Sequence, residues 1–248
     1  MLKRIVLGVI VLSMSLFAQQ IKVFSASSTK LAMQEIVEKF QSTNPKDEIV
    51  VTYNATGKAY AQLSNGFEYD IFIAADSQYP AQIAKDGNAI TQPKLYAMGT
   101  VALYSTDATL IKLGIDALKS DKIKHISIAN PRLAPYGVAA LEILKNYGLE
   151  ELTSKKLVLG DNIAQSVQFV DSGAADIGLV AFSLIKTTTK ESQYKVLDQS
   201  KYSPMEQSFV ITKYAKDKEI AFKFASFLTS KESQEIFQKY GFGSIDKL

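Results

Sequence analysis

Four segments of this 248-residue chain place hydroxyl-bearing or small residues directly before the expected start of a helix. They are residues 25–29 (SASST), 54–58 (NATGK), 130–137 (NPRLAPYG) and 160–163 (GDNI). Backbone amides in the first turn of a helix lack an acceptor within the helix, and the helix dipole adds positive charge there. Such amides and neighbouring hydroxyl groups can together donate hydrogen bonds to an anion. The pattern therefore indicates anion binding.

A serine or threonine before a helix also has an ordinary structural role. It can cap the helix by accepting a hydrogen bond from a first-turn amide. This role explains any single one of the four segments, and several strand-to-helix junctions are common in an α/β fold. The convergence of all four segments on one anion is therefore a hypothesis that the sequence favours without requiring it.

Residue types that would support catalysis or a metal site are sparse. The chain has no cysteine and a single histidine, His125, which argues against a zinc site. Asp70 and Asp76 bracket a predicted strand that would separate them by about 20 Å, too far for paired acid–base catalysis. Neither a G-x-S-x-G nucleophile motif nor a G-x-x-x-x-G-K-[ST] loop occurs. We therefore expect a binding protein, not an enzyme, with neither a metal nor a cofactor.

The elements that must position the four segments alternate along the chain. Short apolar runs alternate with amphipathic helical patterns, which predicts an α/β fold with mixed, mostly parallel sheets. The predicted strands are residues 21–24, 48–53, 70–75, 100–104, 125–129, 177–180 and 209–212. The predicted helices cover residues 32–40, 58–64, 137–147, 163–171 and, with a break near Ser230, 216–240. Since no long linker divides the chain, two lobes would require strands that cross between them.

Residues 1–18 have the features of a secretory signal peptide. Lys3 and Arg4 precede an apolar run, which is followed by small and apolar residues that end at Ala18. We expect cleavage after Ala18 and export to the bacterial periplasm, which suits a chain without cysteine. Without Lys3 and Arg4, the 28 basic residues become 26, against 25 acidic residues. This balance indicates neither a nucleic acid nor a charged membrane surface as partner.

Several blocks of sequence follow one another in a diagnostic order and spacing. They are VFSASSTKLAMQEI, YNATGKAYAQL followed by YDIFIAAD, NPRLAPYGVAALEIL, LGDNIAQSVQFVDSGAADIGLVAFS and the final IFQKYGF. From about Ile21 to the end, this order resembles the ModA family of periplasmic molybdate-binding proteins, the extracytoplasmic components of ABC importers. The resemblance implies a monomeric receptor that delivers an oxyanion to a membrane permease.

The resemblance also implies a fold and its division. It is the type II periplasmic binding-protein fold, in which two α/β lobes hold the ligand in the cleft between them and close around it by a hinge motion. Lobe I would comprise residues 19–98 plus 206–248, and lobe II residues 99–205.

Four positions of this chain match oxyanion-binding positions of the family. In lobe I, Ser28 and Thr56 would donate hydrogen bonds from their hydroxyl groups, with Thr56 standing where the family usually has serine. In lobe II, Tyr136 and Ile163 would donate from their backbone amides.

Other positions near these contacts are weaker candidates. Ser27 and Gly57 are adjacent positions that could donate backbone amides. Some family members use a tyrosine hydroxyl at the position of Ala181, so this chain either makes one contact fewer or uses another donor. Lys58 and Arg132 flank predicted contacts, and we expect both side chains to be solvated.

The chemistry of these donors limits the ligand. Molybdate and tungstate are tetrahedral dianions without a proton at neutral pH, so a site of hydroxyl and amide donors suits them. Phosphate retains a proton and calls for an acceptor, yet only Asp161 lies beside a predicted contact. Sulfate has the same charge and shape as molybdate, but its bonds are shorter. We therefore expect molybdate or tungstate, with sulfate or another tetrahedral oxyanion as the alternative.

Overall fold

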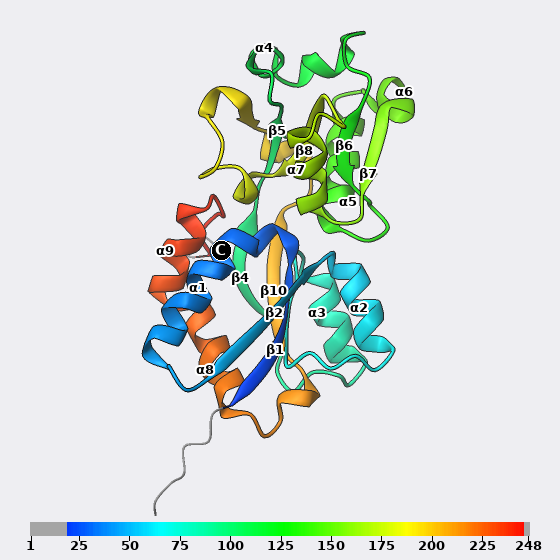
Figure 1. Cartoon of the computed structure of the whole chain (residues 1–248). Helices are drawn as coiled ribbons and strands as arrows, with labels where there is room; N and C mark the ends of the chain where they lie inside the picture. The colour runs from blue at the N-terminus through cyan, green and yellow to red at the C-terminus, as the bar shows by residue number, and fades with distance from the viewer. Residues whose placement is uncertain (1–18, 246–248) are drawn as a thin grey trace, which may run out of the picture.

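The structure, a computed structural model, describes residues 19–245 and has two α/β lobes stacked end to end (Figure 1). The expected signal peptide, residues 1–18, lies outside the described residues. Between residues 19 and 245, none of the helices has the length and hydropathy needed to cross a membrane. The strands are β1 (Gln20–Ala26), β2 (Glu48–Asn54), β3 (Ile71–Ile73), β4 (Lys94–Gly99), β5 (Val101–Tyr104), β6 (Ile126–Ala129), β7 (Leu157–Gly160), β8 (Ile177–Ala181), β9 (Tyr194–Val196) and β10 (Met205–Ile211). The α-helices are α1 (Lys30–Thr43), α2 (Thr56–Ser64), α3 (Gln78–Lys85), α4 (Ala108–Lys112), α5 (Pro135–Asn146), α6 (Glu150–Thr153), α7 (Ile163–Asp171), α8 (Glu219–Leu228) and α9 (Lys231–Lys239).

The first sheet, with the strand order β2-β1-β3-β10-β4, is the centre of lobe I. β1 pairs in parallel with β2 and β3, and β10 pairs antiparallel with β3 and β4. Helices α1, α8 and α9 cover one face, and α2 and α3 cover the other (Figure 1). Because successive side chains of a strand point to opposite faces, Val23 packs with α1 and α8 while Phe24 packs with α2 and α3.

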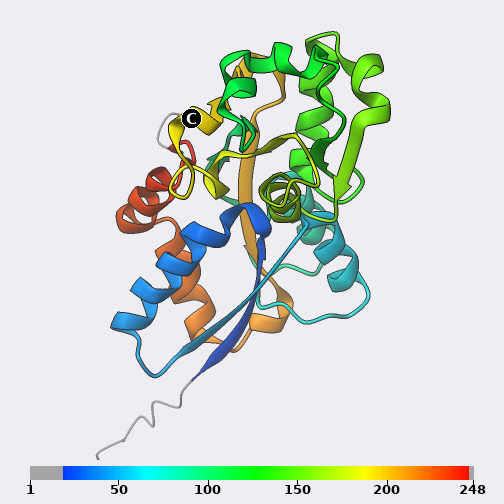
Figure 2. The ribbon, with the colours of Figure 1, turned by 45° about the horizontal axis from the view of Figure 1, so that its top comes forward.

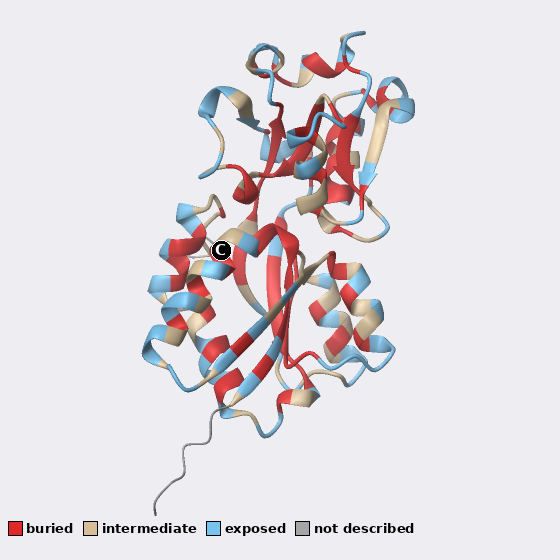
Figure 3. Cartoon of the chain, viewed as in Figure 1, coloured by how far each residue is buried: buried red, intermediate tan, exposed pale blue. Residues whose placement is uncertain are grey.

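The second sheet, with the order β7-β6-β8-β5-β9, is the centre of lobe II. β6 pairs in parallel with β7 and β8, and β5 pairs antiparallel with β8 and β9. Helices α5 and α7 pack against β6 and β8. All residues of β6 and β8 are buried (Figure 3), which explains why both read as continuous apolar runs in the sequence.

The lobes are joined where two chain segments cross between them. β4 ends at Gly99 and β5 begins at Val101, while the chain returns to the first sheet at Met205, the first residue of β10. Gly99 and Met205 are paired in the sheet, so the two crossings lie side by side. The expected lobe boundaries, between residues 98 and 99 and between residues 205 and 206, fall at these crossings. We infer that the hinge lies here.

The α/β architecture with one mixed sheet in each lobe agrees with the prediction. The expectation of mostly parallel sheets was too strong, because each sheet has two parallel and two antiparallel pairings. All seven predicted strands are present, and the three missed strands, β4, β7 and β9, lie at sheet edges. An edge strand has neighbours on one side only, so it does not need a continuous apolar sequence. Helix α3 was missed because Pro80 near its start reads as a helix breaker, although proline is tolerated in the first turn.

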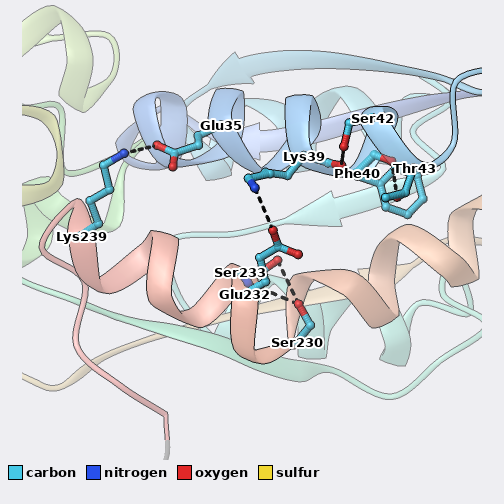
Figure 4. A network of polar contacts seen from close by, with 9 residues as sticks. All are labelled: Glu35, Lys39, Phe40, Ser42, Thr43, Ser230, Glu232, Ser233 and Lys239. Carbon is cyan, nitrogen blue, oxygen red and sulfur yellow. Dashed lines mark hydrogen bonds and ion pairs between the residues drawn. The ribbon is translucent and has the colours of Figure 1, made fainter.

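Charged side chains tie the C-terminal helix α9 to α1 (Figure 4). Lys239 Nζ lies 2.6 Å from Glu35 Oε2, which also accepts a hydrogen bond of 2.9 Å from the Tyr240 hydroxyl. One helical turn further along α1, Lys39 Nζ lies 3.2 Å from Glu232 Oε1. The hydrogen bond from Lys239 lowers the pKa of Glu35, and the bond from Tyr240 adds to this effect. The network holds α1, whose first turn borders the cleft between the lobes, against the C-terminal end of the chain.

Replacing Glu35 with glutamine should reduce stability in a pH-dependent way. We expect Glu35→Gln to lower the free energy of unfolding at neutral pH by less than about 1 kcal/mol, since the ion pair is partly exposed. A carboxylate with a lowered folded-state pKa stabilises above its ordinary value of 4.5, and the contribution is lost as the pH falls through the lowered pKa. The difference between wild type and variant should therefore vanish in acid.

Urea unfolding at a series of pH values would measure this difference. The Lys239→Met variant and the double variant complete a thermodynamic cycle that isolates the pair. A wild-type advantage that stays constant from neutral pH to pH 3 would contradict the assignment.

Candidate functional site

The four segments singled out in the sequence meet between the lobes. Each follows a strand: β1 leads to α1 through a 3-10 turn (Ser27–Thr29), β2 to α2, β6 to α5 and β7 to α7. β1 and β2 are parallel neighbours in one sheet, and β6 and β7 in the other, so each lobe presents two helix N-termini at the carboxyl ends of its strands. In Figure 2, α7 is seen nearly along its axis beside the turn between β1 and α1, and the two are in contact. A small cavity between them is lined by Ala26, Ser27, Ser28, Asn54, Ala55, Thr56, Ala75, Ala134, Pro135, Tyr136 and Ile163.

Ser28 has the most informative side chain of the cavity. It is 1% exposed, and within residues 19–245 its hydroxyl oxygen has no hydrogen-bond partner. Two other hydroxyl groups of the segment are engaged, because Ser25 Oγ and Thr29 Oγ1 lie 2.6 Å apart and Thr29 Oγ1 donates to the Ala26 carbonyl at 2.8 Å. Ser27 and Ser28 open the 3-10 turn, where backbone amides have no acceptor within the helix. Burying a hydroxyl without a hydrogen-bond partner costs free energy unless a ligand accepts a hydrogen bond from it.

Thr56 is the first residue of α2 and 1% exposed. Its Oγ1 accepts a hydrogen bond of 3.1 Å from the Ala75 amide, which fixes the orientation of the side chain. A hydroxyl that already accepts one bond still has its own proton to donate. Thr56 therefore adds a second oriented hydroxyl donor to the cavity from lobe I.

Tyr136 contributes a backbone amide from the start of α5. The preceding Pro135 has no N–H group, and the following Gly137 donates its amide to the Ala134 carbonyl at 2.9 Å. A Cβ on Gly137 would lie 2.2 Å from the Ala129 carbonyl oxygen, so only glycine lets the helix begin this close to the end of β6. The Tyr136 amide is thus the first N–H group of the helix, at a residue that lines the cavity.

Ile163 contributes the second amide of lobe II, from the first residue of α7. The side chain of Asn162 caps this helix and accepts hydrogen bonds from the amides of Ala164 at 3.0 Å and Gln165 at 3.1 Å. The cap therefore takes the second and third amides and leaves that of Ile163, a residue that lines the cavity, uncapped. The ordinary capping role and the anion-binding role coexist in this segment.

Gly57 has a different role from the amide donation expected of it. Its amide donates a hydrogen bond of 2.9 Å to the Leu133 carbonyl of lobe II, and Gly57 does not line the cavity. A Cβ at this position would lie 2.6 Å from the Tyr79 hydroxyl oxygen and 3.0 Å from the Leu133 oxygen. Gly57 thus permits the close contact between the lobes instead of facing the cavity.

Charged residues near the four segments lie outside the cavity. Lys58 and Asp161 form an ion pair of 3.9 Å between the lobes, with side chains 45% and 66% exposed, and Arg132 is exposed. Among the described residues, the lining contains no charged side chain. Ala181 is buried in β8 opposite Val101 and offers no hydroxyl.

The two aspartates that bracket β3 have structural partners. Asp70 accepts a hydrogen bond from the Lys22 amide and pairs with Lys218 Nζ, both at 2.8 Å. Asp76 accepts a bond of 2.9 Å from the Tyr79 amide at the start of α3. The part of the chain from residue 19 to residue 245 holds no group of three or more histidine, cysteine, aspartate or glutamate residues that could bind a metal ion.

Gln207 and Ser183 were missed in the sequence and connect the site to the hinge. Gln207, in β10, donates a hydrogen bond of 3.3 Å to the Tyr136 hydroxyl and accepts one of 2.9 Å from the Tyr96 hydroxyl. Ser183, just after β8, donates to the Ser28 carbonyl. Burial raises the pKa of Tyr136 far above its ordinary value, so its hydroxyl stays neutral. No local pattern could reveal these contacts, because the partners are 71 to 155 residues apart in the chain.

The donors define what the cavity can hold. Two hydroxyl-bearing residues, Ser28 and Thr56, line the cavity together with the first residues of two helices of the other lobe, and among the described residues the lining offers neither a carboxylate acceptor nor a cation. Helix N-termini favour negative charge. The arrangement therefore suits a small, fully ionised anion that accepts a hydrogen bond at every oxygen.

Comparisons with known proteins agree with an anion-binding site. Residues 21–243 match the family described as bacterial extracellular solute-binding protein. The molybdate-binding protein ModA of Azotobacter vinelandii is 32% identical over 243 residues, which cover 96% of this chain and 96% of that protein. ModA of Rhodobacter capsulatus is 32% identical over 195 residues, which cover 78% of this chain and 77% of that protein.

The fold of a solved relative also agrees. The periplasmic molybdate-binding protein of Azotobacter vinelandii superimposes with a TM-score of 0.85 at 27% identity, over 90% of this chain and 98% of that chain. The family match over residues 21–243 includes both lobes and all four helix starts at the cavity. The chain belongs to the bacterial extracellular solute-binding protein family and, within it, to the ModA proteins.

Proposed function

We propose that this protein captures molybdate in the periplasm, binds tungstate as well, and delivers the oxyanion to the membrane permease of an ABC importer. The similarity to ModA proteins supports this function. The observation that carries it is the buried, unpartnered hydroxyl of Ser28 in a cavity bordered by the amides of Tyr136 and Ile163 and the hydroxyl of Thr56. A tetrahedral dianion supplies the acceptors that these donors need.

The character of the lining supports molybdate over phosphate. Phosphate at neutral pH retains at least one proton, and a site selective for it needs an acceptor for that proton. Asp161, the one acidic residue beside a predicted contact, lies outside the cavity and pairs with Lys58. Sulfate has no proton either, so its exclusion must rest on its shorter bonds and on the size of the closed cavity.

Contacts between the lobes support a mechanism in which closure completes the site. Ser28 and Thr56 belong to lobe I, whereas Tyr136 and Ile163 belong to lobe II, so an anion contacts all four only when the lobes are together. The bond from the Gly57 amide to the Leu133 carbonyl also joins the lobes. We infer that hinge motion at Gly99 and Met205 opens and closes the cavity.

The setting of the protein follows from the same proposal. A signal peptide at residues 1–18 and membership of an extracellular family support a periplasmic location. The receptor breaks no bond of its ligand, so we infer no enzymatic step and no cofactor. We expect a monomer that presents the closed, loaded lobes to the permease.

The direct test of this function is thermal unfolding of the mature protein with molybdate, tungstate, sulfate or phosphate added separately. A ligand at a thousand times its Kd stabilises the fold by about 4 kcal/mol, which raises the Tm of a chain of this size by roughly 8–16 °C. We expect this increase with molybdate and tungstate. An increase with sulfate alone would reassign the ligand to the alternative oxyanion, and no increase with any of the four would overturn the receptor function.

Removing the hydroxyl of Ser28 should weaken molybdate binding without destabilising the unliganded protein. We expect Ser28→Ala to weaken molybdate binding by about 10- to 100-fold, the effect of losing a hydrogen bond to a charged group. The Tm of the unliganded protein should stay the same or rise, because the oxygen that is removed is buried without a partner.

Thr56→Val is the matched variant. It should weaken binding similarly, but it should also destabilise the unliganded fold by about 1–3 kcal/mol, since the Ala75 amide loses its acceptor. Calorimetric titration and unfolding of both variants would measure the two effects. Unchanged affinity in Ser28→Ala would remove this hydroxyl from the site.

A methyl group at position 57 should act mainly on closure. Gly57 lies in the first turn of α2 with an ordinary helical backbone, and the Tyr79 hydroxyl, 2.6 Å from the new Cβ within lobe I, is the far end of a side chain that can shift, so Gly57→Ala should leave the unliganded Tm close to that of wild type. In the closed form, however, the new Cβ would lie 3.0 Å from the Leu133 carbonyl oxygen of lobe II, a backbone atom. We expect molybdate affinity to fall at least tenfold, measured by titration. Wild-type affinity would show that the lobes do not need to approach this closely.

A further inference from the structure

Ser183 makes a hydrogen bond that joins the lobes at the most important donor of the site. It lies in the 3-10 turn (Phe182–Leu184) that follows β8 and is 3% exposed. Its hydroxyl donates to the backbone carbonyl of Ser28 at 2.7 Å, although the two residues are 155 positions apart. The donor belongs to lobe II and the acceptor to lobe I. The bond therefore requires the lobes to be together.

The surroundings of Ser183 also contain the lobe II part of the site. The side chains of Ser183 and Ser28 both lie near the Tyr136 hydroxyl, where they partly offset the effect of burial on its pKa. Tyr136 lines the cavity, and its hydroxyl accepts a hydrogen bond from Gln207 in the crossing strand β10. Ser183 thus lies at the point where Ser28, Tyr136 and the hinge come together.

Ser183 does not line the cavity, so it does not touch an anion there. Ser183 can affect anion binding only through Ser28, because its hydroxyl donates a hydrogen bond to the Ser28 carbonyl. Fixing this carbonyl fixes the backbone of the 3-10 turn, and the direction of the Ser28 hydroxyl and amide depends on that backbone. When the lobes separate, the carbonyl loses this donor and the turn loses its constraint.

We propose that Ser183 is a positioning residue that couples lobe closure to the donor geometry of Ser28. This inference rests on the proposed oxyanion-binding function. A bond that exists only in the closed form stabilises the liganded state without contributing to the open one. Its loss should therefore accelerate ligand dissociation and leave association nearly unchanged.

The test compares Ser183→Ala with Ser127→Ala. Ser127 is a matched control, because its buried hydroxyl also donates to a backbone carbonyl, that of Ser166 at 2.9 Å, but entirely within lobe II. Molybdate affinity would be measured by calorimetric titration, dissociation rates by stopped-flow displacement, and the unliganded Tm by thermal unfolding. Ser183→Thr, which keeps the hydroxyl, tests for rescue.

We expect Ser183→Ala to bind molybdate about tenfold more weakly, through a dissociation rate raised by about the same factor, with an unliganded Tm close to that of wild type. Ser127→Ala should show the reverse, a lower Tm with wild-type affinity. Ser183→Thr should recover most of the lost affinity. A Ser183→Ala protein with wild-type affinity, or one that loses Tm as Ser127→Ala does and keeps its dissociation rate, would overturn the inference.

The two proposals fail in distinguishable ways. Wild-type protein that binds molybdate while Ser183→Ala binds equally well would overturn the role of Ser183 alone. Wild-type protein that responds to no oxyanion would overturn the proposed function together with the inference that rests on it.

Discussion

The rest of the structure depends on one electrostatic feature: the cavity for a fully ionised anion is lined, among the described residues, by neutral groups alone. Among the described residues, no cation lines the cavity, so the favourable field comes from helix N-termini and from hydroxyl groups that have no competing acceptor. Backbone amides are suitable for this task because the helix fixes their direction before the ligand arrives. The helix starts differ in how their polar groups are paired. Asn162 caps its helix and leaves the first amide uncapped, and Pro135 has no amide proton, so the next amide is that of Tyr136. The Ser28 hydroxyl has no partner within residues 19–245.

This feature also explains why two lobes are needed. One sheet offers two neighbouring helix N-termini at the carboxyl ends of its parallel strands, which surround an anion on one side only. A second sheet facing the first completes the cradle. The lobes can come close because small residues line their contact: Ala26, Ala55 and Ala75 of lobe I pack within the apolar cluster of lobe II, and Gly57 reaches the Leu133 carbonyl. The same packing of the two lobes thus closes the cavity and brings the donors of both lobes together.

Much of this arrangement was predictable because it depends on local rules. Buried strands such as β6 and β8 are apolar throughout, helix α7 has the predicted bounds 163–171, and Ser230 marks the break before α9. The sequence was less informative about strands that have a neighbouring strand on one side only. β4, β7 and β9 are sheet-edge strands whose composition is not forced by burial on both flanks. The prediction overestimated the share of parallel pairings. The antiparallel pairings all involve β5 or β10, the strands next to the two crossings between the lobes.

For the site, the sequence by itself determined the types of donor and their places at four helix starts, since hydroxyl, glycine and proline residues act on the backbone next to them. Only the tertiary structure decided which of these donors remain available. Ser25 and Thr29 bond to each other, while the Ser28 hydroxyl has no partner among the described residues, and the Gly57 amide is used between the lobes instead of in the cavity. The contacts of Ser183 and Gln207 belong to the same category. The availability of a hydrogen-bond donor depends on every group within about 3 Å, and folding brings those groups from positions far apart in the chain.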